Sequence, residues 1–176
     1  MLELTAHPAQ PCDDLRVSAS AERGPGGAIS LRWRVEGPVE TIVWPPAATG
    51  RANELWRTTC FEAFVAPAGG EGYVEINRSP SGAWNVYQFD GPRAGMREVA
   101  VIGTAFSAAP GNTHAEYGFA TRLPGLSEGD WQLGLTAVVE RTDGRVHHFA
   151  LSHGAERPDF HDRACFTLAL AAPASA

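Results

Sequence analysis

The 176-residue sequence contains only three cysteines, Cys12, Cys60 and Cys165, and no two of them form a Cys-x-x-Cys pair. This scarcity argues against a disulfide framework and against a cysteine-based zinc site. No segment approaches the roughly 20 consecutive apolar residues of a membrane helix. The first residues also lack the basic start and the apolar run of a secretory signal. We therefore expect a cytoplasmic protein without a membrane partner.

Basic residues are in the minority, with 14 Lys and Arg against 20 Asp and Glu and a net charge of -6. Because phosphate contacts dominate the affinity for nucleic acids, this balance argues against a nucleic-acid partner. The chain also lacks the motifs of serine hydrolases, phosphate-binding loops, dinucleotide-binding folds and zinc proteases. We therefore favour a small-ligand-binding protein without catalytic activity.

Sustained helical periodicity is absent, and apolar residues instead alternate with polar ones at the period of two that is typical of β-strands. The 19 glycines and 13 prolines are scattered along the chain, as turns between short strands require. Strands are predicted at residues 28–36, 40–44, 55–66, 72–79, 82–90, 97–102, 115–122, 130–141, 145–152 and 164–170. Short strands at this spacing predict an all-β fold, an antiparallel β-sandwich.

No composition shift divides the chain, so we predict a single domain at residues 1–170 and a loose tail at residues 171–176. Four of the five tryptophans fall in the apolar phase of a predicted strand. These four are expected in the core: Trp33, Trp44, Trp84 and Trp131. Trp56 begins its strand, where a loop can leave an aromatic ring exposed.

Glu62 interrupts the otherwise apolar stretch LWRTTCFEAFV at residues 55–65. By the alternation of a strand, it shares a face with Trp56. If the next strand pairs with this one, Tyr73, Glu75 and Asn77 line the adjoining face. Carboxylates and an amide beside aromatic rings suit a saccharide, which offers apolar ring faces and hydroxyl groups. The alternative is that these residues form the solvated side of a sheet.

Four segments carry a resemblance to a known family: ELWRTTCFEAFVAP, GYVEINRSPSGAWNVYQFDG, DWQLGLTAVVE and HHFALSHGAERPDFHDRACFTL. Over residues 25–170 the chain resembles the bacterial DOMON-like proteins, which are related to family 9 carbohydrate-binding modules and to DOMON haem or sugar domains. The resemblance implies a two-sheet, jelly-roll-like sandwich with a ligand site on one face. It also implies that Trp56 stacks on a sugar ring and that Glu62 accepts a hydrogen bond from a hydroxyl group. A second aromatic side chain is then expected from a late loop, where Phe160 or His161 is available.

Histidines and acidic residues cluster near the C-terminus and suggest an alternative, a metal-dependent site or an enzyme in the His147–His161 region. The candidate ligands for a divalent metal are His147, His153, Asp159 and His161. No fixed zinc-ligand spacing is present, and such residues are more often surface or hydrogen-bonded histidines. Glu62 and Glu75 could also act as an acid–base pair like that of glycosidases.

Two further alternatives are a haem-binding protein and a structural module that binds a partner through an exposed sheet edge. A haem would have Met96 as its only plausible thioether ligand, and the chain has no Cys-x-x-Cys-His attachment motif. No cofactor is therefore the main expectation. The favoured ligand is a saccharide or a glycan fragment, held by Trp56, Glu62, Tyr73, Glu75, Asn77, Phe160 and His161.

Overall fold

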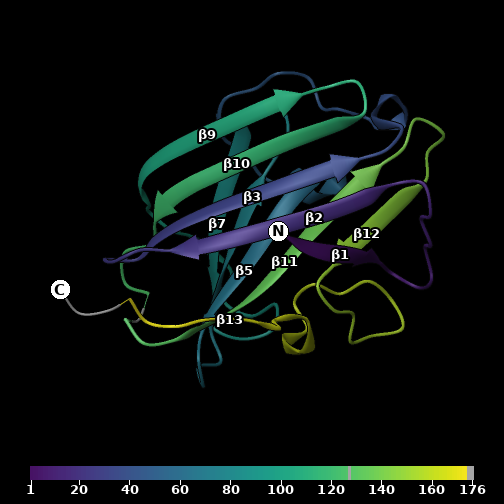
Figure 1. Cartoon of the computed structure of the whole chain (residues 1–176). Coiled ribbons are helices and arrows are strands. Elements are labelled where there is room, and N and C mark those ends of the chain that lie inside the picture. The colour runs from purple at the N-terminus through teal and green to yellow at the C-terminus, as the bar shows by residue number, and fades with distance from the viewer. Residues whose placement is uncertain (127, 174–176) are drawn as a thin grey trace.

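The computed structural model describes residues 1–126 and 128–173, and strands make up nearly all of its regular structure (Figure 1). The strands are β1 (Leu2–Ala6), β2 (Arg16–Arg23), β3 (Ala28–Glu36), β4 (Gly50–Arg51), β5 (Cys60–Pro67), β6 (Tyr73–Arg78), β7 (Ala83–Phe89), β8 (Arg97–Glu98), β9 (Ile102–Pro110), β10 (His114–Arg122), β11 (Trp131–Glu140), β12 (Val146–Ala150) and β13 (Leu168–Leu170). In the described ranges the only helices are three 3-10 turns, η1 (Val39–Thr41), η2 (Leu55–Arg57) and η3 (Arg163–Cys165). The predicted all-β class is confirmed.

The strands form one 13-stranded sheet in the order β4-β7-β6-β5-β11-β12-β1-β2-β3-β10-β9, with β8 and β13 attached beside β7 and β11. All these pairs are antiparallel except β4 with β7. The sheet curls into a half-barrel, so that β9, β10, β3 and β2 form a front layer over β7, β5 and β11 (Figure 1). The prediction of two separate sheets is not confirmed, because β1 pairs with β2 of the front layer and with β12 of the back layer.

The core lies between the two layers and is filled by the inward-facing residues of each strand. Trp33 of β3 is fully buried there and stacks on Phe61 of β5, with 5.7 Å between the ring centroids. Its indole Nε1 donates a hydrogen bond to the Thr136 carbonyl oxygen of β11 at 3.1 Å. Of the other tryptophans expected in the core, Trp131 is fully buried, whereas Trp44 and Trp84 are partly buried and pack against its margin.

Several predicted strands are shorter than expected because the chain turns at their ends. The strand predicted at residues 55–66 begins only at Cys60, since Glu54 adopts a left-handed conformation (φ 57°) and residues 55–57 form η2. The segment at 40–44 forms part of η1 and a single bridge at Ile42 instead of a strand. Likewise, only Arg97–Glu98 of the strand predicted at 97–102 form β8, while Ile102 already begins β9, and the strand predicted at 164–170 is confined to β13.

Four strands were not predicted: β1, β2, β4 and β9. Every residue of β9 is exposed, because the strand lies at the open edge of the half-barrel. An edge strand of this kind needs no alternation of apolar and polar residues, so its sequence carries no period-two signal. In β2 the inward positions include the small residues Ala19 and Ala21, which weaken the same signal. The predicted tail at residues 171–176 lies partly outside the described residues.

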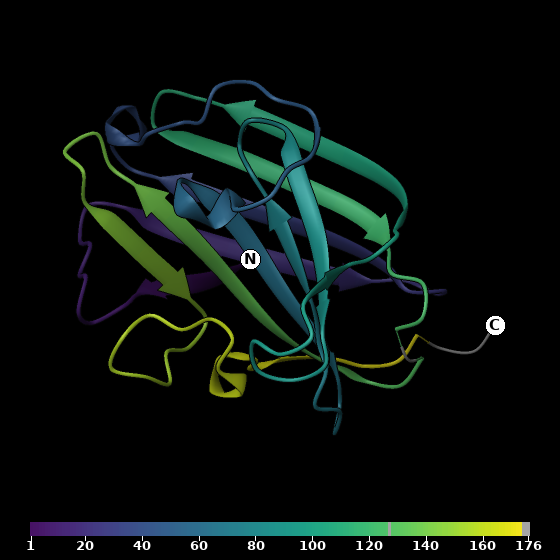
Figure 2. The same cartoon turned by 180° about the vertical axis from the view of Figure 1, so that it is seen from behind.

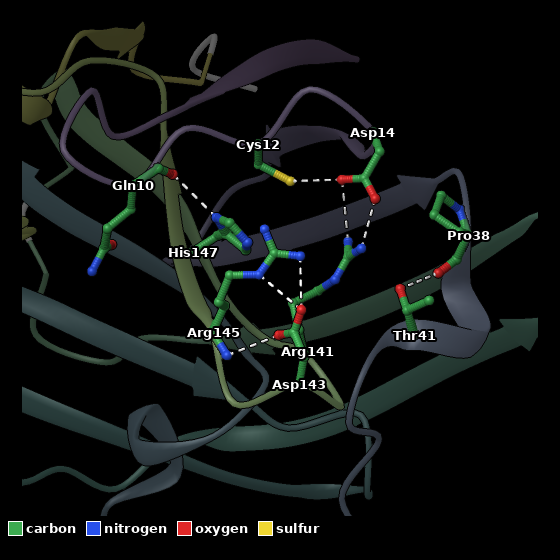
Figure 3. Close-up of polar contacts among 9 residues, drawn as sticks. All are labelled: Gln10, Cys12, Asp14, Pro38, Thr41, Arg141, Asp143, Arg145 and His147. Atoms are coloured by element: carbon green, nitrogen blue, oxygen red, sulfur yellow. Dashed lines mark hydrogen bonds and ion pairs between the residues drawn. The ribbon is translucent and has the colours of Figure 1, made fainter.

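The β11–β12 hairpin is tied to the loop that follows β1 (Figure 3). The buried guanidinium group of Arg141 donates to both carboxylate oxygens of Asp14, with Nη2–Oδ2 at 2.6 Å and Nη1–Oδ1 at 3.4 Å. This contact lowers the pKa of Asp14. His147 Nδ1 lies 3.1 Å from the carbonyl oxygen of Gln10 in the same loop. These contacts fix the position of β12, the strand that contains His148.

Candidate functional site

A cavity of about 350 Å³ lies on the outer face of the back layer, away from the core. This volume is near the lower end of the range of about 300–1,000 Å³ that is usual for small-molecule sites. Figure 2 shows this face with η2 and the loops of residues 90–96 and 151–162 around it. The cavity is lined by Trp56, Glu62, Phe64, Glu75, Phe89, Arg93, Met96, Val138, His148, Pro158, Phe160 and His161.

Strand alternation brings the carboxylates to this face. On β5, Phe61 and Ala63 belong to the core, so Glu62 and Phe64 point to the opposite side. The register of β5 with β6 pairs Phe64 with Glu75. Glu62 and Glu75 therefore lie diagonally across neighbouring strands on the same outer face, as the sequence predicts.

Trp56 reaches the cavity by a different route from the one predicted. It lies on η2 and not on the strand, and 36% of its surface is exposed. Its ring meets Tyr87 of β7 edge-to-face, with centroids 6.1 Å apart. Phe160, from the loop of residues 151–162, also lines the cavity and packs against Phe64, with 6.4 Å between the ring centroids. The cavity thus has aromatic side chains from an early turn and from a late loop, as the resemblance implies.

Glu62 is buried, with only 2% of its surface exposed, and does not lie on an open surface of the sheet. The hydroxyl group of Thr136 donates to its Oε2 atom at 3.3 Å, whereas Oε1 has no hydrogen-bond partner. Burial, reinforced by the nearby charge of Glu75, raises the pKa of Glu62 well above its ordinary value. The carboxyl group therefore keeps an unused acceptor atom beside the cavity.

The carboxyl group of Glu75 accepts a hydrogen bond from a neighbour on its own strand, β6. The side-chain amide of Asn77 donates to Glu75 Oε1 at 2.6 Å, so Asn77 positions this carboxylate and does not itself line the cavity. Burial raises the pKa of Glu75, while the hydrogen bond from Asn77 and the charge of Arg93 act in the opposite direction. The Oε2 atom of Glu75 lies 3.8 Å from His161 Nε2.

Tyr73, like Asn77, supports the cavity from outside its lining. Its hydroxyl oxygen lies 2.6 Å from His161 Nδ1 and accepts a hydrogen bond from the backbone N–H of Arg93 at 3.2 Å. Arg93 in turn pairs with Asp159, Nη2 to Oδ1, at 2.8 Å. Tyr73 thereby joins the loop of residues 90–96 to the loop of residues 151–162, and these two loops close one side of the cavity.

His161 is expected to stay neutral until the pH falls to about 4, because burial and the charge of Arg93 lower its pKa to about that value. In the unfolded chain this histidine takes up a proton near the ordinary pKa of 6.5. As the pH falls from 6.5 towards 4, the unfolded state is therefore protonated while the folded state is not, and the free energy of unfolding decreases. Chemical shifts of the imidazole ring, followed by NMR across a pH series, measure the titration directly. A midpoint near 6.5 would contradict the buried, neutral state.

The structure does not bring the proposed metal ligands together. His147 and His153 contact carbonyl oxygens of Gln10 and Thr5, at 3.1 and 2.8 Å, and Asp159 contacts Arg93. Of the four candidates, only His161 lines the cavity. Within residues 1–126 and 128–173, no group of three or more His, Cys, Asp or Glu side chains is arranged to hold a metal ion. Met96, the candidate thioether ligand of a haem, also lines the cavity.

Other lining residues were not predicted as part of the site. Phe64 could have been found from strand alternation, since it shares a face of β5 with Glu62. Phe89 lies opposite Tyr73 of the neighbouring strand β6, a pairing that the sequence alone does not fix. Arg93 and Pro158 lie in irregular loops, where no periodicity indicates the direction of a side chain. His148 could not be assigned without knowing how β12 pairs with β11.

Similar folds are found among solved structures. The structure of a protein described as carbohydrate-binding from Bacteroides uniformis matches with a TM-score of 0.68 and 18% identity over 94% of this chain and 82% of that one. A family 9 carbohydrate-binding module from Caldicellulosiruptor kristjanssonii in complex with cellotriose matches with a TM-score of 0.57 and 9% identity, over 99% and 84% of the two chains. A complex of such a module with glucose gives a TM-score of 0.50 at 9% identity, over 85% and 74%. At these identities the likeness shows a shared fold.

Comparisons of the sequence itself gave no match, either among protein-family models or among curated proteins. The resemblance to DOMON-like proteins is therefore not confirmed by a family match. In the part of the chain that the structure describes, no helix has the length and apolar character needed to span a membrane.

Proposed function

We propose that this protein binds a saccharide, without catalysis, in the cavity between η2 and the loop of residues 151–162. The observation that carries the proposal is the combination of Trp56 and Phe160 with the buried carboxyl groups of Glu62 and Glu75 in one cavity. The fold neighbours that hold cellotriose and glucose support the same ligand class.

Each part of the cavity meets a different part of a sugar. The half-exposed ring of Trp56 offers an apolar surface on which the C–H face of a pyranose can stack. The Oε1 atom of Glu62 lacks a donor, and a sugar hydroxyl supplies one. The carboxyl oxygens of Glu62 and Glu75 can each form hydrogen bonds with sugar hydroxyl groups, which makes these two residues the polar anchors of this mode of binding.

A glycan array followed by calorimetry tests this function. We expect one or more saccharides to bind with a 1:1 stoichiometry and to be recovered chemically unchanged. Recovery of hydrolysed sugar would instead support the acid–base pairing of Glu62 and Glu75. A protein that binds none of the saccharides on a broad array would contradict the proposal.

A further inference from the structure

The charged groups around the cavity come from several elements, and acidic groups outnumber basic ones among them. Glu62 and Glu75 project from β5 and β6, and among the residues that the structure describes Arg93 is the only Lys or Arg that lines the cavity. Its guanidinium group is already paired with Asp159 at 2.8 Å. His148 and His161 complete the set, and burial lowers the pKa of each, which favours their neutral forms. With both glutamates ionised, the surroundings of the cavity carry an excess of negative charge.

Glu62 is the least compensated of these groups. It is almost completely buried, and its Oε1 atom has no hydrogen-bond partner among the described residues. Its other oxygen, Oε2, accepts from the hydroxyl group of Thr136, which is uncharged. A buried carboxylate with a free acceptor is stabilised more by a cationic donor than by a neutral one, because the cation adds a Coulomb attraction to the hydrogen bond.

The aromatic walls favour a cation as well. The face of an aromatic ring attracts an ammonium group, and this attraction strengthens when the cation is desolvated. Phe64, Phe89 and Phe160 line the same cavity as Glu62 and Glu75 and contribute aromatic surface besides Trp56. An ammonium group also offers three N–H donors, enough to contact both carboxylates at once.

We propose that the cavity prefers saccharides that carry a free, protonated amino group over the corresponding neutral sugars. This inference rests on the proposed saccharide-binding function and specifies its ligand class. The ammonium group would contact Glu62 Oε1 and the carboxylate of Glu75, while the sugar ring would stack on Trp56. An N-acetylated sugar lacks the charge and is expected to bind like a neutral one.

Calorimetric titrations with glucosamine, glucose and N-acetylglucosamine test the preference at about pH 6.5, where a primary amine is protonated. We expect glucosamine to bind about tenfold or more tightly than the other two, as one charge-assisted hydrogen bond in a buried site implies. The titrations are repeated in two buffers of different ionisation enthalpy. Because the pKa values of Glu62 and Glu75 are raised in the free protein, binding of the cation is expected to release protons, whereas binding of glucose is not.

Glu62→Gln separates the role of the charge from that of shape. It is expected to reduce the ratio of glucosamine affinity to glucose affinity towards one and to reduce proton release. Glu71→Gln makes the same chemical change at an exposed residue outside the cavity and is expected to leave both quantities unaltered.

The outcomes distinguish this inference from the function on which it rests. Equal or tighter binding of glucose would overturn the amine preference and leave saccharide binding intact. Failure of every sugar, here and on the array, would overturn the proposed function. Cyclohexylamine serves as a probe with the charge but without the hydroxyl groups, and if it binds as tightly as glucosamine, the preference for a saccharide is overturned.

Discussion

Replacing Trp56 by alanine is expected to weaken saccharide binding about 30-fold or more, since a tryptophan that anchors a ligand commonly contributes about 2 kcal/mol. The same change is expected to alter the melting temperature by only a few degrees. Trp56 lies on a short 3-10 turn, is partly exposed, and contributes nothing to the core between the two layers. Calorimetry with the tightest-binding saccharide and a thermal melt of the same sample measure both quantities.

Two controls separate stacking from general damage to the protein. Trp56→Phe keeps an aromatic face and is expected to retain much of the affinity that alanine loses. Phe106→Ala removes an aromatic side chain of similar exposure from β9 in the front layer, away from the cavity, and is expected to leave binding unchanged. Undiminished binding by Trp56→Ala would show that the ring is not a ligand platform.

Glu62→Gln is expected to increase the free energy of unfolding at neutral pH by about 1–3 kcal/mol, the range for relieving a poorly satisfied buried polar group. Burial and Glu75 raise the pKa of Glu62 above its ordinary value of 4.5. The folded protein therefore holds a proton that the unfolded chain has already lost. Stability falls as the pH rises from 4.5 through the folded-state pKa, and glutamine removes this contribution.

Urea unfolding of the parent and the variant across a pH series measures this effect. The two curves are expected to lie close together below pH 4.5 and to separate as the pH rises. The matched variant Glu71→Gln, in the exposed turn between β5 and β6, is expected to follow the parent at every pH. A Glu62→Gln protein that is less stable than the parent at all pH values would mean that the carboxylate is part of a stabilising network. Together with the loss of ligand preference, higher stability would identify Glu62 as a residue retained for binding.

The sequence predicted which face of β5 and β6 carries the two carboxyl groups, but not the other strand residues that line the same cavity. Alternation on β5 and β6 separates Glu62 from Phe61 and Glu75 from Val74, and this separation puts the carboxylates on one face. Alternation could not show that this face is covered, because the covering segments have no regular periodicity. Glu62 was for that reason expected on a more open surface than the one it occupies.

The approach of Trp56 to the cavity depends on a local backbone conformation that the pattern of residues does not encode. Glu54 has a φ of 57°, in the left-handed region of backbone conformation that residues other than glycine rarely adopt. The chain then forms η2 before β5 begins at Cys60, so Trp56 reaches the cavity of Glu62 from a turn and not from the same strand. The spacing of the two residues was a useful signal, but the geometry inferred from it was wrong.

The architecture was predicted to the level of its class. Alternation shows that each strand has one buried face, and this holds equally for two stacked sheets and for one curled sheet. The distinction rests on β1, which pairs with β2 through Leu2–Leu4 and with β12 through Thr5 and Ala6. The order of apolar residues along a short strand does not indicate that the strand changes pairing partners along its length.

The most direct test of the proposed site is an NMR titration of isotope-labelled protein with the saccharide that binds most tightly. We predict that the largest chemical-shift changes fall on the indole N–H of Trp56 and on the backbone amides of Glu62, Glu75 and His161. Residues of β9 and the outer face of the front layer are predicted to remain unchanged. Shift changes confined to the front layer, with none around Trp56 and Glu62, would contradict the assignment of this cavity as the saccharide site.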